Sequence, residues 1–512
     1  MTKKPFILTL FIILLFNTAI TYSQELKLSN LFCDNMVLQH GTEVPVWGVA
    51  APKEKIRVKF AGQSVTTRTG KDGKWMVVLA PLEASKTPRE MTISGKKEIV
   101  FSNVVVGEVW ICSGQSNMQF AVSNAPEVDA LLSSAKNIRS FEVKRTVSFK
   151  EEDNVSGKWK DVPPSSAVAF GFAYFLEKAE DIPIGIIHAS WGSSSLEAWM
   201  PRDMAEEFPY FKDIMNDLDA DTETRNRINK ALSSGEERTT KEDIFMRRQP
   251  NILYNAMMKP LAPYACRGLV WYQGERNTRY YSGVPMVNED NWYHRVIGMK
   301  EYGDVLQSWV KRYRKEWKNN KMYFSVVMLP GYGKGTNNNP DIDSKSPTAM
   351  SWAWMRESQQ KVLDLPYTSV VNTIDLGDET DVHPKDKLPI GKRLALLAQK
   401  HTLDKDIVAE GPVLIQVKAQ DNGLVIYFNN AKGLKTIDQK DPRGFWIADE
   451  SMQWHMAEAK IVGETVVLSN DAIKNPVYVR YAFAGKPDVN LVNAADLPAY
   501  PFRTDNEIPT DE

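Results

Sequence analysis

The fold of this 512-residue chain is decided by the stretch Val104-Val-Val-Gly-Glu-Val-Trp-Ile-Cys-Ser-Gly-Gln-Ser-Asn-Met118. An apolar, β-branched run ends abruptly in small polar residues around Gly114, which predicts a buried strand followed by a sharp turn. Gly114 has no Cβ, so the backbone can bend tightly there or approach a ligand closely. Ser116, just beyond the turn, would lie at the carboxyl edge of a sheet, where open α/β folds bind ligands. If a helix follows, its free N–H groups would favour negative charge that develops near Ser116.

Length and composition place the chain among ordinary globular proteins. With 512 residues it is too long for one core, so two or three domains are expected. Hydrophobic residues make up 43% and charged residues 25%, which is the usual balance of such domains. The formal net charge is −1, so no global field attracts nucleic acid or an anionic membrane. An acidic substrate would have to be recognised by a few local Arg or Lys residues.

The N-terminus has the pattern of a secretory signal peptide. Lys3 and Lys4 precede the apolar run 6–16, and small or polar residues follow, which predicts a signal peptide over residues 1–23 with cleavage after Ser23. An uncleaved anchor is the alternative, but the run is shorter than the ~20 residues that a spanning helix needs. We therefore expect an exported protein, periplasmic or secreted, with no stable membrane insertion. The sequence predicts no particular oligomeric state.

Three kinds of pattern follow one another along the rest of the chain. Residues 24–104 consist of short alternating runs with a hairpin signal at Lys71-Asp-Gly-Lys74, which predicts an N-terminal β-sandwich. Over residues 105–402, strand-like runs alternate with helical segments, as in a parallel sheet with crossover helices. A charged, helix-prone insertion occupies about 202–248 of this domain. Short alternating runs return over 403–512 and predict a C-terminal β domain.

Five apolar runs are the candidate strands of the parallel sheet: Val104–Ile111, Ile182–His188, Gly268–Tyr272, Tyr323–Leu329 and Thr368–Asp375. The second run is followed by Trp191-Gly192, where a glycine could offer an unobstructed backbone N–H to a ligand. The third gives way to a dense polar set that contains Gln273, Glu275 and Asn277.

Acyl transfer by a serine needs a base with a pKa near 7, which points to histidine. The chain has six histidines, so elimination is practical. Only His383 follows a strand of the α/β region and lies among acidic residues. Pro384 disfavours the helical conformation for His383 and keeps it in an extended turn. The other five lie in the β domains, in a strand run, in a polar segment or at a helix end: His40, His455, His188, His294 and His401.

Three motifs carry a resemblance to a known family. Gly114-Gln-Ser-Asn-Met118 after a strand resembles the first block of the SGNH hydrolases, in the branch of the sialate O-acetylesterases. Trp271-Tyr-Gln-Gly-Glu-Arg-Asn277 and Asp381-Val-His-Pro384 resemble two further motifs of that branch. The resemblance covers most of the chain beyond the signal peptide. It implies an α/β fold with an SGNH-type (flavodoxin-like) parallel sheet, helices on both of its faces, and flanking N-terminal and C-terminal β domains.

The resemblance implies a role for each matching residue. Ser116 would be the nucleophile and His383 the base. The oxyanion hole would consist of the backbone N–H groups of Ser116 and Gly192 and a side-chain N–H of Gln273 or Asn277. Glu275 would be a buried hydrogen-bonding support.

The triad acid and the substrate contact are less directly implied. The widest SGNH pattern places an Asp three residues before the His, where this chain has Thr380. Asp381 stands two before and could lie beside His383, since residues two apart in an extended segment share a face. Asp378 or a backbone carbonyl are the alternatives. Arg356 could pair with a sugar carboxylate, because its planar fork suits bidentate binding, or could form a salt bridge on a helix surface.

The function implied is that of a serine esterase that hydrolyses O-acetyl esters on sugars, with 9-O-acetyl groups of sialic acids favoured, through an acetyl-enzyme. Acetylated xylan or another plant glycan is the close alternative, and a non-catalytic glycan-binding protein on the same scaffold is a different class. The scattered cysteines Cys33, Cys112 and Cys266 fit neither a disulfide framework nor a zinc site. No metal or cofactor is expected, and a Cys112 nucleophile is a remote option.

Overall fold

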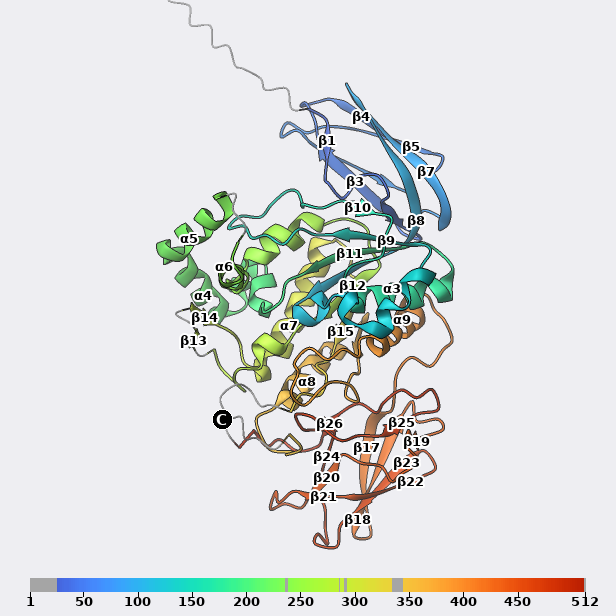
Figure 1. Cartoon of the computed structure of the whole chain (residues 1–512), viewed down its shortest axis with the longest axis vertical. Helices are drawn as coiled ribbons and strands as arrows, with labels where there is room; N and C mark the ends of the chain where they lie inside the picture. The colour runs from blue at the N-terminus through green and yellow to red at the C-terminus, as the bar shows by residue number, and fades with distance from the viewer. Residues whose placement is uncertain (1–24, 235–237, 285, 290–291, 334–343, 511–512) are drawn as a thin grey trace, which may run out of the picture.

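The computed structural model describes residues 25–234, 238–284, 286–289, 292–333 and 344–510. The expected signal peptide lies outside the described residues. Along the long axis of the molecule, an N-terminal β domain, an α/β domain and a C-terminal β domain follow one another (Figure 1). Among the described helices, none combines the length and the apolar character that crossing a bilayer requires.

The α/β domain is built on a central sheet whose main strands are parallel. Their spatial order is β11-β8-β12-β15-β16. Numbered along the chain, this order is 2-1-3-4-5, which is the order of one common doubly wound sheet. These strands coincide with the five runs expected from the sequence: β8 (Glu98–Gly114), β11 (Ile184–Ser190), β12 (Gly268–Tyr272), β15 (Tyr323–Val327) and β16 (Thr368–Val371).

The sheet also has two strands that the sequence did not indicate. β9 (Ile138–Glu142) pairs in parallel with β11, and β10 (Trp159–Lys160) pairs antiparallel with β9, so the sheet as a whole is mixed. The apolar pattern of β9 is interrupted by Arg139, which is nevertheless buried because its guanidinium donates to the main-chain carbonyls of Asn35 and Asn103. A buried arginine with such partners cannot be told from an exposed one by its sequence.

Aromatic contacts place helices on both faces of the sheet. Trp110 of β8 packs against Phe172 of α3 (Ala167–Glu180) and against Tyr323 of β15. The next residue of β15, Phe324, packs against Trp309 of α7 (Met299–Glu316). Because successive strand residues point to opposite faces, α3 and α7 cover opposite sides of the sheet. α9 (Leu388–Thr402) lies beside α3, and α8 (Trp352–Gln360) lies beside α7 (Figure 1).

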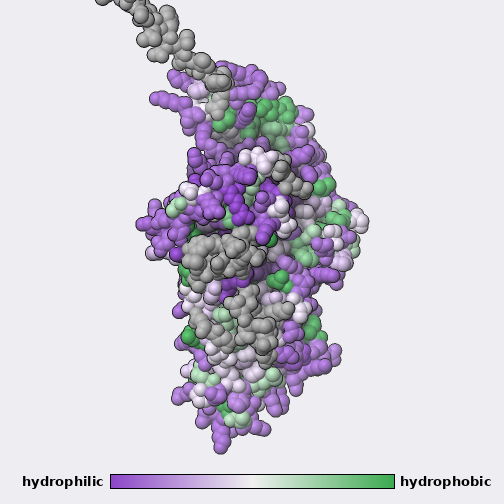
Figure 2. All heavy atoms as spheres, turned by 60° about the vertical axis from the view of Figure 1, so that its left-hand side comes forward, coloured by the Kyte–Doolittle hydropathy of each residue, from purple (hydrophilic) through white to green (hydrophobic). Residues whose placement is uncertain are grey.

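The N-terminal β domain shares a strand with the central sheet. The boundary expected at residue 104 falls inside β8, whose first half belongs to the β domain and whose second half is fully buried in the central sheet. Figure 2 shows a hydrophobic patch on this domain, whose exposed apolar side chains include Met76, Val78 and Val100. The other strands are β1 (Lys27–Leu28), β2 (Val37–Gln39), β3 (Val44–Val49), β4 (Lys55–Phe60), β5 (Gln63–Arg68), β6 (Lys74–Leu79) and β7 (Ser85–Ser94).

The charged insertion is helical, as the sequence predicts. It contains α4 (Pro209–Ala220), α5 (Thr222–Ser233) and α6 (Thr240–Arg247). α6 begins with a capping box, in which the Thr239 hydroxyl and the Glu242 carboxylate each accept the other residue's backbone N–H. The remaining short elements of the α/β domain are α1 (Ser116–Gln119), α2 (Pro126–Asp129), β13 (Met286–Glu289), β14 (Trp292–Arg295) and single-turn segments that include η3 (Leu196–Trp199).

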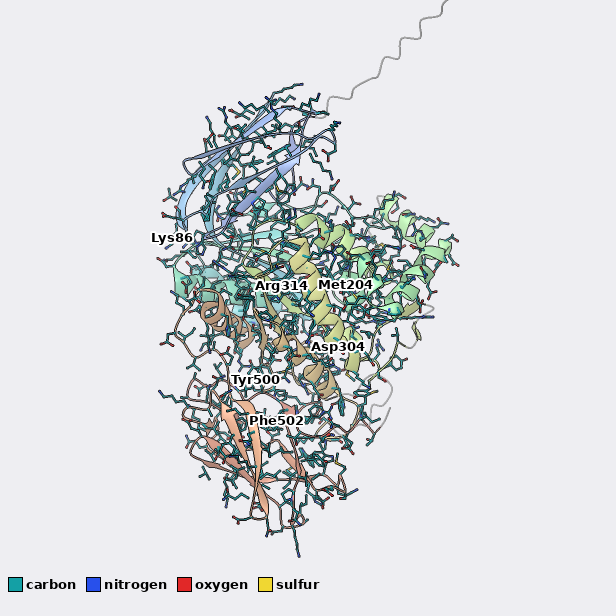
Figure 3. The ribbon with its side chains drawn as sticks, turned by 180° about the vertical axis from the view of Figure 1, so that it is seen from behind. Lys86, Met204, Asp304, Arg314, Tyr500 and Phe502 are labelled. Atoms are coloured by element: carbon teal, nitrogen blue, oxygen red, sulfur yellow. The ribbon has the colours of Figure 1, made fainter. Side chains whose placement is uncertain are left out.

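The C-terminal β domain docks against the α/β domain through specific hydrogen bonds. The Tyr500 hydroxyl donates to the carbonyl oxygen of Val370 on β16 at 2.7 Å, and Figure 3 shows Tyr500 and Phe502 at the junction of the two domains. The domain's strands are β17 (Val413–Gln420), β18 (Gly423–Asn429), β19 (Lys435–Thr436), β20 (Phe445–Ala448), β21 (His455–Met456), β22 (Glu458–Val462), β23 (Thr465–Ser469), β24 (Tyr478–Tyr481), β25 (Leu491–Val492) and β26 (Phe502–Arg503).

Candidate active site

Ser116 lies two residues beyond the end of β8, at the carboxyl edge of the central sheet. The turn before it requires glycine: Gly114 has φ +137°, and a Cβ there would lie 2.1 Å from the carbonyl oxygen of Tyr272. Ser116 is the first residue of α1, so its backbone N–H has no partner within that helix. The turn therefore holds a hydroxyl and a free backbone donor at the position that the sequence predicts.

His383 faces Ser116 across the site. Its Nε2 lies 2.8 Å from the Ser116 Oγ, although the two residues are 267 positions apart in the chain. The carboxylate of Asp378 fixes the segment before His383, because it accepts the backbone N–H groups of Thr380 and Asp381. Both side chains of the pair are half-buried. Acyl transfer by a serine requires a contact of this kind between a hydroxyl and an imidazole.

The surroundings of His383 favour its neutral form. Burial lowers the pKa of His383, the ammonium of Lys387 lowers it further, and the carboxylate of Asp381 raises it in part. The net direction is downward from the ordinary value. A neutral imidazole at neutral pH can accept the proton of Ser116, so the electrostatics suit a general base.

Asp381 does not make the contact expected of a triad acid. Its Oδ1 accepts the backbone N–H of His383 at 2.8 Å, and its side chain is exposed. Among the described residues, no carboxylate forms a hydrogen bond with the His383 Nδ1. The prediction that Asp381 orients the imidazole directly is therefore corrected: the short Asp side chain folds back on its own turn, where a backbone donor two residues on is closer.

A hydrogen-bonded network, of which the sequence indicated only Glu275, joins the turn of Ser116 to the segment of His383. The Asn117 Nδ2 donates to the Glu275 carboxylate at 2.5 Å and to the carbonyl oxygen of Val382 at 3.0 Å. The Asn117 Oδ1 accepts from the Lys387 Nζ at 2.7 Å. Both polar atoms of the Asn117 side chain therefore form hydrogen bonds, and these bonds hold the segment around His383 against the turn of Ser116. For Asn117, the only sequence signal was its place within the Gly-Gln-Ser-Asn-Met motif.

Gly192 also meets Ser116. A Cβ at Gly192 would lie 3.1 Å from the Cβ of Ser116, so the two backbones are in direct contact. The Gly192 N–H donates to the side-chain Oε1 of Gln119 at 2.7 Å. Gly192 therefore lies beside Ser116, and its N–H is bound to the side-chain oxygen of Gln119.

Gln273 and Asn277 lie at the same edge of the central sheet as Ser116, but their side-chain amides are hydrogen-bonded to other buried groups of the protein. Both are fully buried, and the Gln273 Nε2 donates to Gln115, Ser194 and Asn277 at 3.0–3.2 Å. The Asn277 Nδ2 donates to the buried carboxylate of Glu197 and to a main-chain carbonyl. The expectation that one of them supplies the oxyanion with an N–H is not met in this geometry, because these amide hydrogens already have acceptors. Nearer to the nucleophile is the Gln115 Nε2, 3.5 Å from the Ser116 Oγ.

Arg356 corrects a second expectation. Its side chain is completely buried, and its guanidinium donates to the main-chain carbonyls of Pro330, Ala484 and Gly485. Burial lowers its pKa to about 9. Arg356 therefore neither binds a sugar nor forms a surface salt bridge, since the fork that would pair with a carboxylate ties α8 to the C-terminal β domain.

A Ser–His–Glu set lies on β9 and β11, the strands to one side of β8, separate from the pair of Ser116 and His383. The His188 Nδ1 lies 2.7 Å from a Glu142 carboxylate oxygen, and its Nε2 lies 2.6 Å from the Ser190 Oγ. Burial raises the pKa of Glu142, but the hydrogen bond and charge of His188 lower it to about 2. His188 and Ser190 are each only 3% exposed, so a substrate cannot reach them. These hydrogen bonds connect the carboxyl ends of β9 and β11.

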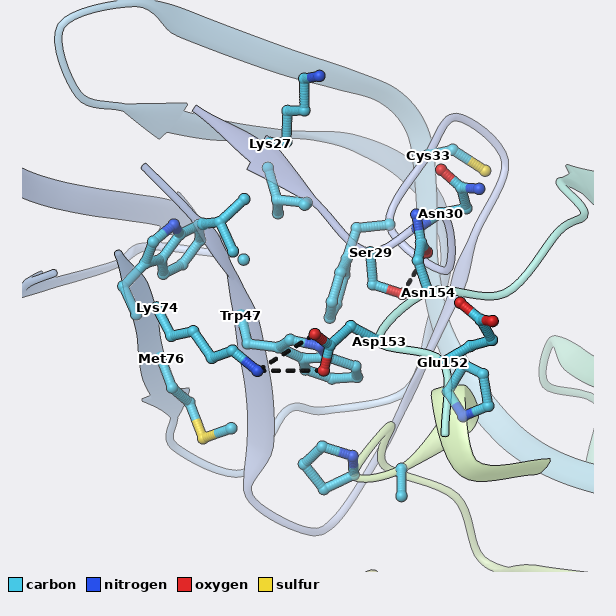
Figure 4. A pocket seen from close by; sticks show the side chains of 18 of the residues that line it. Lys27, Ser29, Asn30, Cys33, Trp47, Lys74, Met76, Glu152, Asp153 and Asn154 are labelled. Atoms are coloured by element: carbon cyan, nitrogen blue, oxygen red, sulfur yellow. Dashed lines mark hydrogen bonds and ion pairs between the residues drawn. The ribbon is translucent and has the colours of Figure 1, made fainter. Parts of the chain in front are cut away.

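Cys112, the alternative nucleophile, is enclosed in the central sheet. Cys112 is buried in β8, and burial raises its pKa, which disfavours the reactive thiolate. Within the described part of the chain, no group of three His, Cys, Asp or Glu side chains could hold a metal ion. A cleft of about 1180 Å³ lies elsewhere, between the N-terminal β domain and the α/β domain, and is spanned by an ion pair of Lys74 and Asp153 (Figure 4).

Comparisons with known proteins give consistent results. No protein-family profile matches the sequence. The chain is 25% identical over 505 residues to the sialate O-acetylesterase of Mus musculus, covering 89% of each chain. It is 24% identical over 500 residues to the sialate O-acetylesterase of Homo sapiens, covering 89% of this chain and 87% of that one. Among solved structures, a carbohydrate acetylesterase from Xanthomonas citri superposes with a TM-score of 0.77 and 29% identity, covering 94% of this chain and 100% of that one.

Proposed function

Since the chain belongs to the sialate O-acetylesterase family and is a carboxylic ester hydrolase, we propose that it removes O-acetyl groups from sugars with Ser116 as nucleophile and His383 as general base. The observation that carries this proposal is the 2.8 Å contact between the Ser116 Oγ and the His383 Nε2. The network through Asn117 supports it, because it fixes the two partners relative to each other.

The proposed reaction has two halves. The Ser116 Oγ attacks the acetyl carbonyl carbon while the His383 Nε2 takes the hydroxyl proton, and the carbonyl electrons move onto oxygen. The tetrahedral intermediate collapses to an acetyl-enzyme, and His383 returns the proton to the departing sugar hydroxyl. A water molecule, deprotonated by His383, then attacks the acetyl-enzyme and releases acetate and free Ser116.

The oxyanion needs donors that point to the developing charge. The Ser116 N–H, at the start of α1, is one proposed donor. The Gly192 N–H is the second, and it becomes available when the Gln119 side chain gives up its 2.7 Å contact. The exchange is local, because the Gln119 amide is a side chain on the surface of the same short helix and is half-buried.

The favoured substrate is an O-acetylated sialic acid, with the 9-O-acetyl ester as the first choice. Support comes from the mammalian relatives, which are named for sialate esters and align with 89% of this chain. Acetylated xylan or another plant glycan is the alternative substrate.

The finer assignments of fold and location are proposals of the same kind. We infer that residues 105–402 form an SGNH-type hydrolase domain, which the strand order of the sheet supports. Residues 24–104 and 403–512 would be its flanking β domains. The N-terminal pattern supports export through a signal peptide over residues 1–23, to the periplasm or the medium.

Acetate release from 9-O-acetylated sialic acid and from acetylated xylan tests the proposal. We expect release by the wild-type protein and a loss of at least about 10³-fold in Ser116→Ala. The preferred substrate decides which sugar is the natural class. Persistent release by folded Ser116→Ala would refute the nucleophile assignment. A serine-directed organophosphate should block the wild-type protein, and a thiol reagent should not, because Cys112 is buried.

A further inference from the structure

Four arginines gather beside the turn that carries Gly192. We define the arginine cluster as Arg145, Arg238, Arg247 and Arg248. Arg145 lies three residues beyond the carboxyl end of β9, and the other three flank or end α6. They come from two segments about a hundred residues apart that meet at the carboxyl edge of the central sheet. The face that carries the helical insertion is mainly hydrophilic (Figure 2).

Contacts place the cluster next to the esterase site. The Arg248 Nη2 lies 3.4 Å from the Oγ of Ser193, which is the residue after Gly192. The Arg238 guanidinium lies 6.0 Å from the ring centre of Trp191, the residue before Gly192, and its Nη2 lies 3.4 Å from the carbonyl oxygen of Arg145. Because Gly192 lies against Ser116, Arg238 and Arg248 are separated from Ser116 by this one turn. Arg145 and Arg247 adjoin these two arginines, Arg145 through its backbone carbonyl and Arg247 as the preceding residue of Arg248.

Two of the guanidinium groups have no counter-charge bound to them. Among the described residues, neither Arg145 nor Arg247 forms an ion pair or a side-chain hydrogen bond through its guanidinium, and the Arg247 Nε is buried without an acceptor. The two nearby acids are already engaged: Asp243 accepts from the Arg238 Nε at 2.7 Å, and Glu142 is held by His188.

Burial and neighbouring positive charge both act on the cluster. Burial lowers the pKa of Arg247 to about 10, Asp243 opposes this, and the charges of Arg248 and Arg145 lower it further. Burial also lowers the pKa of Arg145, although Glu142 and Asp243 raise it. Arg247 and Arg248 are half-buried and Arg145 is exposed, and an anion that binds beside these like charges would be stabilised by them. A guanidinium is also the group best suited to bidentate binding of a carboxylate.

We propose that the arginine cluster is an anion subsite that binds the carboxylate of an acidic sugar while the O-acetyl group of that sugar lies at Ser116. The inference rests on the proposed function and makes it more specific, because a neutral xylan or glucan lacks the group that the cluster would bind. Arg145 and Arg247 are the central ligands, since no acceptor among the described residues uses their guanidinium donors. Arg248 connects the subsite to the turn of Gly192.

Competitive inhibition tests the subsite without depending on which acetyl ester is the natural substrate. The wild-type protein would hydrolyse 4-nitrophenyl acetate in the presence of N-acetylneuraminic acid, which has the carboxylate but no O-acetyl group, or of its methyl ester. We expect the acid to inhibit at least about tenfold more strongly than the ester. Arg247→Gln and Arg145→Gln should each raise the inhibition constant of the acid about tenfold or more and leave that of the ester within twofold. Arg247→Lys, which keeps the charge but loses the fork, should fall between.

A matched control is available on the same helix. Lys241 of α6 is exposed, so Lys241→Gln removes the same charge and should leave the inhibition constant unchanged. Equal inhibition by acid and ester, no inhibition by either, or inhibition by the acid that is unchanged in both arginine variants would overturn the subsite. The proposed function would stand in those cases if Ser116→Ala abolished acetate release. Conversely, a persistent release by Ser116→Ala would refute the proposed function and leave the inhibition result intact.

Discussion

The ammonium of Lys387 lies 2.7 Å from the side-chain oxygen of Asn117, the residue that directly follows Ser116. Lys387 is completely buried and lies over the rings of Phe120 and Tyr272, with its Nζ 5.0 and 5.7 Å from the ring centres. Burial lowers its pKa to about 8, while Asp386, Glu275 and Asp381 raise it. Lys387 therefore keeps a positive charge beside His383 through the neutral range and lowers the pKa of that base.

The first prediction concerns the pH dependence of the esterase. His383 must be neutral to accept a proton, so activity is lost as the pH falls through its pKa. Lys387→Met removes a charge that disfavours the imidazolium, so the pKa of His383 should rise and the acidic limb of kcat/KM should move to higher pH. Activity at pH 5.5 should therefore fall more than activity at pH 8. The exposed neighbour Lys385 is the control, and Lys385→Met should leave the limb in place. A uniform loss at every pH would show that Lys387 only supports the fold of the site.

The second prediction separates the base from its neighbour. His383→Ala removes the group that touches Ser116, and we expect kcat to fall by about 10⁴-fold or more. Asp381→Asn keeps an oxygen that can accept the His383 backbone N–H, so we expect a loss below about tenfold, which corresponds to roughly 1.4 kcal/mol. Initial rates with 4-nitrophenyl acetate would measure both. A loss near 10⁴-fold in Asp381→Asn would restore Asp381 as the acid that orients the imidazole.

The sequence indicated which polar residues follow strands and would meet at the sheet edge. It did not indicate the buried residues, such as Lys387, that link those positions by hydrogen bonds. Ser116 and His383 could be found because each follows an apolar run, and parallel strands end at one edge of a sheet. The role of Lys387 could not, because its partner is 270 residues away and a lysine after Asp-Val-His-Pro is ordinarily a solvated residue. Strand β9 was missed for a related reason, since Arg139 interrupts its apolar run and is satisfied by groups distant in the chain, among them the carbonyl oxygen of Asn103 and the carboxylate of Asp161.

For Arg356 the sequence suggested a substrate contact or a surface salt bridge, and the structure shows a buried side chain instead. An arginine on a helix next to aromatic residues is compatible with a substrate contact, and sequence alone does not show which face of α8 it occupies. The C-terminal β domain covers that face and supplies two main-chain carbonyls, those of Ala484 and Gly485, and Pro330 of the α/β domain supplies a third. The arginines near the turn of Gly192 belong to the helical insertion and to the loop after β9. These two segments are distant in the sequence and meet only because the central sheet has folded, so the sequence did not indicate the cluster.

The third prediction concerns the donor that Gln119 holds. If the Gly192 N–H must leave the Gln119 Oε1 to reach the oxyanion, Gln119→Ala should not lower kcat, because it removes the competing acceptor. Gln119→Glu should lower kcat by about 10²-fold, since a carboxylate would hold the N–H more strongly and oppose the negative charge of the intermediate. The two variants would be compared with 4-nitrophenyl acetate at pH 7 and 8. Equal losses in both would show that the Gln119 amide itself contributes to catalysis.

The fourth prediction follows from the buried guanidinium of Arg356. Arg356→Met fills much of the space but leaves the carbonyl oxygens of Pro330, Ala484 and Gly485 without their donor. Because each hydrogen bond to a charged group contributes about 1.5–3 kcal/mol, we expect the free energy of unfolding to fall by roughly 3 kcal/mol or more. Guanidinium denaturation would measure it. Lys361→Met, just beyond α8, breaks an exposed ion pair with Asp304 and should cost no more than about 1 kcal/mol.

Kinetics would then decide between the two roles of Arg356. At a temperature where Arg356→Met remains folded, its KM for 9-O-acetylated sialic acid should equal that of the wild-type protein, because the side chain has no exposed surface to offer a substrate. A variant of normal stability with a raised KM would return Arg356 to the substrate site. That result would also require the junction between α8 and the C-terminal β domain to open during the reaction, since the guanidinium is enclosed by carbonyls from both sides.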